Sequence, residues 1–162
     1  MKVLVTGGGT GGHVYPALSI LEAIRKRYPE AEFLYVGTRK GLEFEIVTKL
    51  GIPFDVIDVK GYTKSSPLDV IKTTHKAFNA LNQAMKLIDK FQPDFVIGTG
   101  GYVSGPIVMA GVLKGKKTAI HEQNVYPGKT NRLLGKMVKR VYISFEESRK
   151  YFGNHSKVLM TG

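Results

Sequence analysis

The residues best suited to chemistry stand near the start of the chain, in the run Gly7-Gly8-Gly9-Thr10-Gly11-Gly12-His13. We call positions 7–12 the first glycine loop. Glycines lack a Cβ atom and let a ligand approach the backbone closely, and Pro16 is typical of the first turn of a helix. Free amides and the positive end of that helix would favour an anion such as a diphosphate. The alternative is a tight turn without a ligand.

The first glycine loop also matches the dinucleotide pattern Gly-x-Gly-x-x-Gly, which a glycine-rich run satisfies easily. The acidic residue that should follow about 20 positions later is replaced by Gly37-Thr38-Arg39-Lys40, and the Walker lysine is absent. A nicotinamide cofactor and ATP are therefore disfavoured. His13 directly follows the loop; its residue type suits a general base near neutral pH, or it shapes the loop by hydrogen bonding.

A second glycine loop, Gly98–Gly101, follows another apolar run and precedes Ser104 and Pro106. Ser104 is a candidate N-cap for the helix that follows. Two such loops at neighbouring strand ends favour a ligand with a long anionic bridge, or two anionic ligands.

Four polar residues, His121-Glu122-Gln123-Asn124, follow a third apolar run, and we call them the polar segment. We expect them to lie outside the core, where they would suit hydrogen bonding to sugar hydroxyls. Glu122 is a candidate base or a residue that orients one. The alternative is a solvated loop with helix caps.

These segments must be positioned by the elements between them, which alternate between two kinds of pattern. Strands are predicted at Lys2–Val5, Glu32–Val36, Phe54–Val59, Phe95–Ile97, Thr118–Ile120, Arg140–Ile143 and Val158–Met160. Helices are predicted at Pro16–Arg27, Leu42–Leu50, Pro67–Phe91, Gly105–Leu113, Lys129–Lys136 and Glu146–Tyr151. The alternation indicates one α/β domain over residues 1–162, a doubly wound, Rossmann-like parallel sheet. Ligands of such sheets bind at the carboxyl ends of the strands.

The charge of the chain points to an anionic partner. The 162 residues carry a net charge of +11; residues 1–60 contribute +1 (8 basic, 7 acidic) and residues 61–162 contribute +10 (16 basic, 6 acidic). The absence of cysteine excludes disulfides, thiolate metal sites and a cysteine nucleophile. We expect no signal peptide, because the apolar run after Met1 is too short for one. The uncharged stretch 95–113 holds five glycines and a proline, which argues against a membrane span. We expect a soluble, cytoplasmic protein.

The two glycine loops and the polar segment occur together in one known family. In their order and spacing, with Pro127-Gly128 and Asn131, they resemble the amino-terminal half of the MurG family of peptidoglycan glycosyltransferases. The resemblance covers essentially the whole chain and implies the amino-terminal, acceptor-binding domain of a GT-B enzyme. It implies an inverting transfer of N-acetylglucosamine (GlcNAc) from UDP-GlcNAc to the C4 hydroxyl of N-acetylmuramic acid (MurNAc) in lipid I, giving lipid II.

The resemblance also implies roles for individual residues. His13, with Glu122 as another candidate, matches the base. Positions that contact UDP-GlcNAc are matched by Thr10, Gly11, Gly12 and Asn124. The acceptor diphosphate would lie against the two loops and nearby motif residues, namely Gly9, Gly100, Gly101, Tyr102, Ser104 and Asn131. No metal and no cofactor beyond the donor substrate are implied.

The chain stops at Thr161-Gly162, near the point where the family passes into a carboxy-terminal nucleotide-sugar domain. We therefore expect the acceptor half of the enzyme, inactive in sugar transfer by itself. The alternative is a membrane-docking subunit that recruits a separate catalytic chain, as in the eukaryotic transferase of dolichol-linked sugar synthesis.

A basic helix suggests where the molecule meets a membrane. On the predicted helix Pro67–Phe91, helical spacing places one set of residues on the expected core face: Val70, Thr74, Ala77, Leu81, Ala84, Met85 and Ile88. Ile71 and Phe78 flank this face, and Lys72 and Lys76 point further round. Apolar residues edged by lysines suit an anionic bilayer, and we expect peripheral attachment to the cytoplasmic face of the bacterial cell membrane; the alternative is a solvated lysine face. A nucleic-acid partner is not expected, because no recognition motif accompanies the charge.

Overall fold

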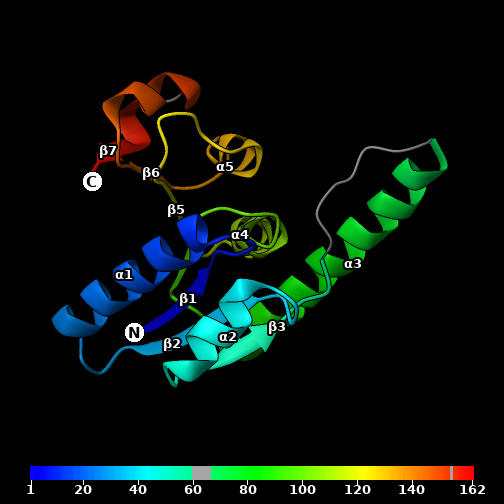
Figure 1. Ribbon diagram of the computed structural model, residues 1–162, viewed down its shortest axis with the longest axis horizontal. Helices are drawn as coiled ribbons and strands as arrows, with labels where there is room; N and C mark the ends of the chain where they lie inside the picture. Colours follow the sequence, from blue (N-terminus) through cyan, green and yellow to red (C-terminus); the bar gives the residue numbers. More distant parts are fainter. Residues whose placement is uncertain (60–66, 154) are drawn as a thin grey trace.

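The computed structural model describes residues 1–59, 67–153 and 155–162, with the side chains of all of these except 67–76 and 155. Seven strands form the frame: β1 (Lys2–Thr6), β2 (Glu32–Gly37), β3 (Phe54–Val56), β4 (Phe95–Gly98), β5 (Lys117–Glu122), β6 (Arg140–Ile143) and β7 (Val158–Met160). Between them lie α1 (Gly11–Arg27), α2 (Leu42–Lys49), α3 (Pro67–Phe91), α4 (Ser104–Leu113), α5 (Lys129–Leu134), and the 3₁₀ helices η1 (Glu146–Tyr151) and η2 (His155–Lys157) (Figure 1).

All strand pairs in the sheet are parallel, in the order β3-β2-β1-β4-β5-β6-β7. The predicted doubly wound parallel sheet is thus confirmed. The chain runs outward from β1 to β3 and then returns to β4 on the other side of β1, so the order reverses between β1 and β4. In open α/β sheets this switch point is where ligands bind, beyond the carboxyl ends of the strands.

Two cores cover the two faces of the sheet. On one face Val3 and Val5 of β1 pack with Val14 and Leu21 of α1. On the other face, Leu4 belongs to a core shared by α3, α4 and α5. Because successive strand residues point to opposite faces, β1 is apolar on consecutive positions, as expected for a strand buried on both sides.

Several boundaries differ from the prediction. Helix α1 begins at Gly11 and not at Pro16, because the amides of His13 and Val14 both donate to the Thr10 carbonyl and start the helix within the glycines. Pro16 therefore lies in the second turn, where it removes one hydrogen bond. The third strand ends at Val56 and not at Val59, and the fifth extends to Glu122.

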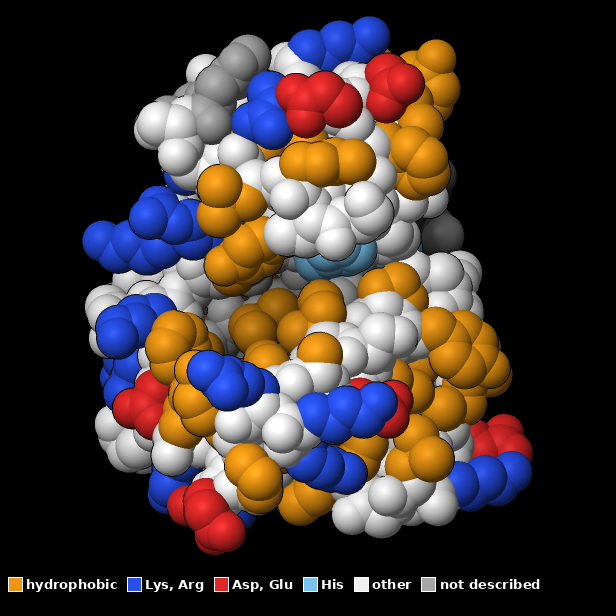
Figure 2. Space-filling view, turned by 90° about the vertical axis from the view of Figure 1, so that its left-hand side faces the viewer, with side chains coloured by type: hydrophobic (Ala, Val, Ile, Leu, Met, Phe, Trp, Pro, Cys, Tyr) orange, Lys and Arg blue, Asp and Glu red, His pale blue; other side chains and the backbone are white. Residues whose placement is uncertain are grey.

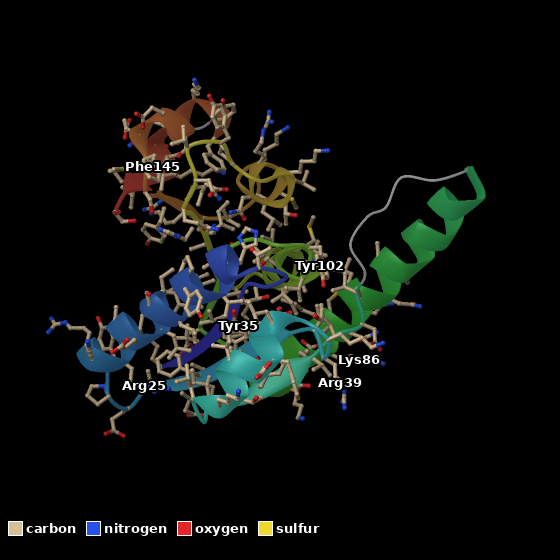
Figure 3. The ribbon with its side chains drawn as sticks, in the orientation of Figure 1. Arg25, Tyr35, Arg39, Lys86, Tyr102 and Phe145 are labelled. Carbon is tan, nitrogen blue, oxygen red and sulfur yellow. The ribbon has the colours of Figure 1, made fainter. Side chains whose placement is uncertain are left out.

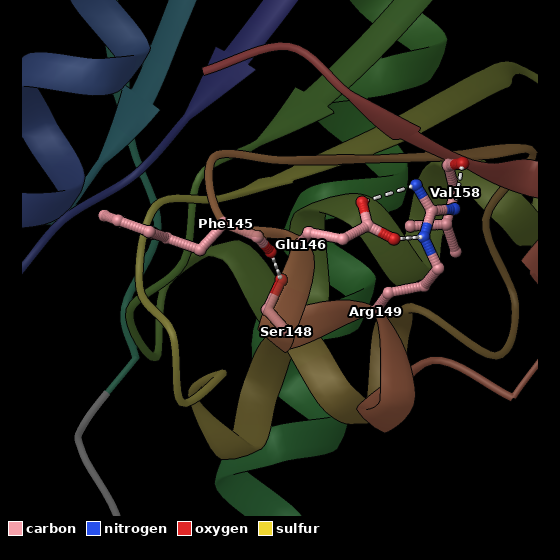
Figure 4. A network of polar contacts seen from close by, with 5 residues as sticks. All are labelled: Phe145, Glu146, Ser148, Arg149 and Val158. Atoms are coloured by element: carbon pink, nitrogen blue, oxygen red, sulfur yellow. Dashed lines mark hydrogen bonds and ion pairs between the residues drawn. The ribbon is translucent and has the colours of Figure 1, made fainter.

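The segment Glu146–Tyr151 forms a 3₁₀ helix and not the predicted α-helix. Figure 4 shows how Arg149 holds it: the guanidinium forms an ion pair with Glu146, with Nη2 2.9 Å from its Oε2, and Nη1 donates to the Val158 carbonyl at 2.7 Å. These contacts connect η1 to β7. Short 3₁₀ helices commonly serve as connectors of this kind.

Helix α3 is the longest element and projects beyond the sheet in Figure 1. Of its predicted core face, Ala84 and Ile88 are buried and Leu81 and Met85 pack against the core, but Ala77 is exposed. The predicted members Val70 and Thr74 lie outside the described side chains. Among the described residues, no helix combines the length and apolar character that crossing a bilayer requires.

Candidate functional site

The first glycine loop, the second glycine loop and the polar segment lie together. They follow β1, β4 and β5, which are neighbours in a parallel sheet, so all three strands end at the same edge. The site is thus at the switch point between β1 and β4. This placement is what the alternation of strands and helices predicted.

The two glycine loops contact each other through their backbones. The Gly8 amide donates to the Gly100 carbonyl at 3.3 Å, and a Cβ atom on Gly101 would overlap with the backbone oxygen of Gly8. Gly100 and Gly101 have φ angles of 113° and 81°, a conformation that favours glycine. The glycines of the second loop are therefore required by loop-to-loop packing as well as by any ligand.

One part of the first-loop prediction needs correction. Two of its amides are already used within the protein: the Gly8 amide as above, and the Gly9 amide, which donates to Oε2 of Glu43 at 3.0 Å. Gly9 therefore offers no free amide to a diphosphate. In the part of the chain that the structure describes, several amides of the two loops have no hydrogen-bond acceptor, among them those of Gly11, Gly12, Gly100 and Gly101.

Sequence reasoning missed Glu43. Its fully buried carboxylate accepts hydrogen bonds from Gly9 and, through Oε1, from the amide (3.0 Å) and hydroxyl (2.8 Å) of Thr38. It fixes the first glycine loop to the end of β2. A signal was present in the glycines, since Gly37 and Gly41 leave room for this carboxylate and a Cβ atom at either would clash with the Glu43 side chain.

Below the loop, Tyr35 donates its hydroxyl to the Gly7 carbonyl at 2.6 Å. Burial, together with the nearby charge of Glu43, raises the pKa of Tyr35 well above its ordinary value. The phenol therefore stays neutral and keeps this hydrogen bond across the physiological range.

The prediction that Ser104 is an N-cap is wrong. Helix α4 starts at Ser104 itself, with Val103 as the N-cap residue, and the buried Ser104 hydroxyl donates to the carbonyls of Gly100 (2.7 Å) and Thr6 (3.2 Å). Ser104 thus stabilises the second glycine loop by hydrogen bonds, and its buried hydroxyl is unavailable to a ligand. Tyr102, 38% exposed at the same edge of the sheet, lies beside Gly9 (Figure 3).

His13 lies in the first turn of α1, half-buried between the loops. Its Nδ1 is 3.2 Å from the Thr99 carbonyl oxygen and 2.7 Å from the side-chain nitrogen of Gln123. The Thr99 hydroxyl donates to the His13 carbonyl at 2.7 Å, so the residue is held at both ends. No protein partner of Nε2 is seen among the described residues, and this nitrogen is the one available to a substrate.

The polar segment is only partly as predicted. We expected it outside the core, but Glu122 is 1% exposed and belongs to β5. Its Oε1 accepts from the amide (3.0 Å) and side chain (2.8 Å) of Asn124, and its Oε2 accepts from the Gly128 amide (3.1 Å) and the Asn131 side chain (3.0 Å). Four donors fill the carboxylate, so Glu122 organises the turn after β5, and the geometry does not favour it as the base.

The predicted residues therefore separate into groups. His13, Thr10, Gly11, Gly12, Gly100, Gly101 and Tyr102 lie at the loop edge, whereas Asn131 is buried against Glu122 and Asn124 is exposed but bonded to it. Of the proposed membrane residues, Phe78 is 61% exposed on α3. Ile71, Lys72 and Lys76 lie outside the described side chains.

His121 directly precedes Glu122 on β5, so its side chain points to the opposite face of the sheet. It lines a groove of about 430 Å³ between α1 and β6, together with Ile20, Ile24 and Tyr142. Figure 2 shows a hollow on one side of the molecule with apolar side chains around it. Burial lowers the pKa of His121 despite the opposing effects of Glu122 and Gln123. No cluster of acidic and histidine residues suited to a metal ion is found in the described ranges.

Comparison with known proteins supports the resemblance seen in the motifs. A UDP-N-acetylglucosamine--N-acetylmuramyl-(pentapeptide) pyrophosphoryl-undecaprenol N-acetylglucosamine transferase of Thermoanaerobacter sp. is 51% identical over all 162 residues, and that of Finegoldia magna is 48% identical. The chain spans 44% of the length of each of these relatives.

Among solved structures, the crystal structure of Acinetobacter baumannii MurG matches 99% of this chain, and 45% of its own, with a TM-score of 0.84 and 30% identity. A complex of Staphylococcus aureus MnaA with UDP matches at a TM-score of 0.73 and 14% identity, which shows the fold alone. The model of the glycosyltransferase family 28 N-terminal domain matches residues 3–143. The chain therefore belongs to the glycosyltransferase family 28 N-terminal domain family.

Proposed function

We propose that this chain is the acceptor-binding half of an enzyme that transfers GlcNAc from UDP-GlcNAc to the C4 hydroxyl of MurNAc in lipid I. The observation that carries the proposal is that His13, whose Nε2 has no protein partner among the described residues, lies at the same edge of the sheet as the unpaired amides of Gly11, Gly12, Gly100 and Gly101. The names of the relatives supply the donor and the lipid-linked acceptor. The chemistry of the edge supplies a base and an anion site.

The proposed reaction uses His13 as the general base. Nε2 takes the proton of the acceptor hydroxyl while its oxygen forms a bond to the anomeric carbon of GlcNAc. The bond from that carbon to the diphosphate breaks, and UDP leaves with the electron pair, which inverts the configuration. Gly100 and Gly101 would hold the lipid diphosphate, and the α1 N-terminus at Gly11 and Gly12 would face the donor, since unpaired helix amides favour phosphate oxygens.

Changing His13 to Gln in the longer protein that contains this segment tests the proposal. Loss of a general base is expected to lower kcat by about 10²- to 10⁴-fold, measured as UDP release with UDP-GlcNAc and a lipid-linked MurNAc acceptor. Glu45→Gln, an exposed change in α2 away from the site, serves as the control. Full activity of the His13→Gln variant, or no transfer by the unaltered protein, would overturn the proposal.

We also propose that the molecule works at the anionic cytoplasmic face of the cell membrane. Phe78 is exposed on the projecting helix α3, and residues 61–162 carry a net charge of +10. Each basic group near an anionic surface contributes about 1 kcal/mol. Some of these basic residues have partners within the protein: Lys114 pairs with Asp89 at 2.7 Å, Lys116 donates to the Gln92 side chain at 2.9 Å, and Lys157 donates to the Val138 carbonyl at 3.3 Å.

Sedimentation with anionic vesicles tests the membrane proposal. The double variant Ile71→Ser and Phe78→Ser is expected to bind less. Tyr28→Ser alters another exposed aromatic residue, directly after α1, and is expected to bind normally. Equal binding of all three proteins would refute the patch. Binding to nucleic acid with a steep salt dependence would instead support the reading rejected above.

A further inference from the structure

The ring of His13 is held by groups from two neighbouring loops. Its Nδ1 lies 3.2 Å from the Thr99 carbonyl oxygen and 2.7 Å from Nε2 of Gln123. Thr99 is itself fixed, since it is buried and its amide donates to the Thr6 carbonyl at 2.9 Å. A Cβ atom on Gly100 would lie 2.8 Å from Nδ1, so this edge of the ring packs closely against the second glycine loop.

The two contacts at Nδ1 of His13 require opposite protonation states of this nitrogen. A carbonyl oxygen only accepts, so the Thr99 contact is a hydrogen bond only if Nδ1 carries the proton. An amide nitrogen only donates, so the Gln123 contact requires a bare Nδ1. A half-turn of the Gln123 amide exchanges its nitrogen and oxygen without changing its shape. In that orientation Nδ1–H donates to two oxygen atoms.

One atom of the amide supports the half-turn. Oε1 of Gln123 is buried and lacks a hydrogen-bond partner in the unrotated orientation. After the half-turn, this oxygen takes the position 2.7 Å from Nδ1 of His13 and accepts its proton. The rotation therefore removes the conflict at Nδ1 of His13 and gives the buried oxygen a partner.

We propose that Gln123 is a positioning residue whose amide oxygen, with the Thr99 carbonyl, holds the proton of neutral His13 on Nδ1. The lone pair of the ring is then on Nε2, the nitrogen for which no protein partner is seen among the described residues. When Nε2 accepts a proton, Nδ1–H still has two oxygen acceptors. The use of Nε2 as a base rests on the proposed function, but the position of the proton does not.

The experiment is nitrogen NMR of the chain with ¹⁵N-labelled histidine, at a pH where the rings are neutral. Protonated and bare ring nitrogens have well-separated chemical shifts, so the spectrum reports the tautomer of each of the four histidines directly. Their signals are assigned by single histidine replacements. We expect His13 to carry its proton on Nδ1, and Gln123→Met to lower the ratio of the Nδ1–H to the Nε2–H form by about three- to tenfold, the range of one hydrogen bond.

Gln123→Glu is the second variant, because it keeps the shape of the side chain and an oxygen acceptor. It should retain the Nδ1–H form and keep the ring doubly protonated to a higher pH, since a carboxylate favours the imidazolium. Gln83→Met on α3, whose side chain accepts from the Asp58 amide, is the matched control and should leave the His13 signals unchanged. An Nε2–H tautomer in the unaltered chain, or a Gln123→Met spectrum with the same tautomer ratio, would overturn the proposal.

Activity separates this inference from the proposed function. In the longer protein, Gln123→Met is expected to lower kcat about as much as it lowers the Nδ1–H population, with little change in KM. If the tautomer behaves as stated but His13→Gln retains full transfer, the base assignment fails and the positioning of His13 by Gln123 stands.

Discussion

Replacing Glu122 by Gln separates a structural role from a catalytic one. Each carboxylate oxygen of Glu122 accepts two hydrogen bonds, from Asn124 on one side and from Gly128 and Asn131 on the other. A glutamine puts an NH₂ group in place of one oxygen. Whichever side it occupies, two donors then face a donor, so two bonds to a charged acceptor are lost.

The expected cost follows from these bonds. A hydrogen bond to a charged group contributes about 1.5–3 kcal/mol, so losing two lowers the free energy of unfolding by about 3–6 kcal/mol. A domain has about 5–15 kcal/mol in all. With a urea m-value of about 2 kcal/mol per M, the unfolding midpoint falls by about 1.5–3 M.

Urea denaturation of the chain, followed by circular dichroism, measures this change. Glu45→Gln, which removes one partner of the exposed Lys49 ion pair, is the control and is expected to leave the midpoint unchanged within error. If Glu122→Gln shifts the midpoint by less than about 0.25 M, equivalent to about 0.5 kcal/mol, the reasoning from its hydrogen bonds is refuted. Loss of transfer without loss of stability would then restore Glu122 as a candidate base.

Three further predictions concern the loops and the buried titratable groups. Gly101→Ala should destabilise the chain far more than Gly115→Ala in a thermal melt: both have positive φ, which costs about 1–2 kcal/mol, but only at Gly101 does the new Cβ overlap with the facing loop. Equal effects would contradict the loop packing. The pKa of Tyr35 is raised on folding, so above pH 10 the unfolded chain loses a proton that the folded chain keeps. The free energy of unfolding should therefore fall by up to about 1.4 kcal/mol per pH unit. In denaturation experiments at pH 9 to 11, Tyr35→Phe should remove this slope, and at neutral pH it should lower the free energy of unfolding by about 1–3 kcal/mol. Because the pKa of His121 is lowered from 6.5, the unfolded chain binds a proton first on acidification and stability should fall as the pH drops below 6.5; a His121→Phe variant with an unchanged slope between pH 5 and 7 would argue against this.

Part of the site followed from local patterns. The strand and helix alternation, the positions of the two glycine loops after β1 and β4, and Pro106 in the first turn of α4 are local properties, set by apolar period and by glycine and proline chemistry. The boundaries at Pro16 and Ser104 were wrong because a helix start depends on which carbonyl the first amides find. The start of α1 at Gly11 depends on the Thr10 carbonyl of the first glycine loop, and Ser104 at the start of α4 donates to the Gly100 carbonyl of the second.

The doubly wound fold and the family resemblance could be predicted from the sequence alone, and so could the sheet edge at which His13, Glu122 and the glycines gather, because the order of strands and short loops leaves little choice of topology. The contacts among those residues depend on the tertiary structure. Glu43 reaches the Gly9 amide from 34 positions away, and Gln123 reaches His13 from 110 positions away. Such contacts depend on the direction and burial of side chains from different strands, and the spacing of residues along the sequence does not indicate them.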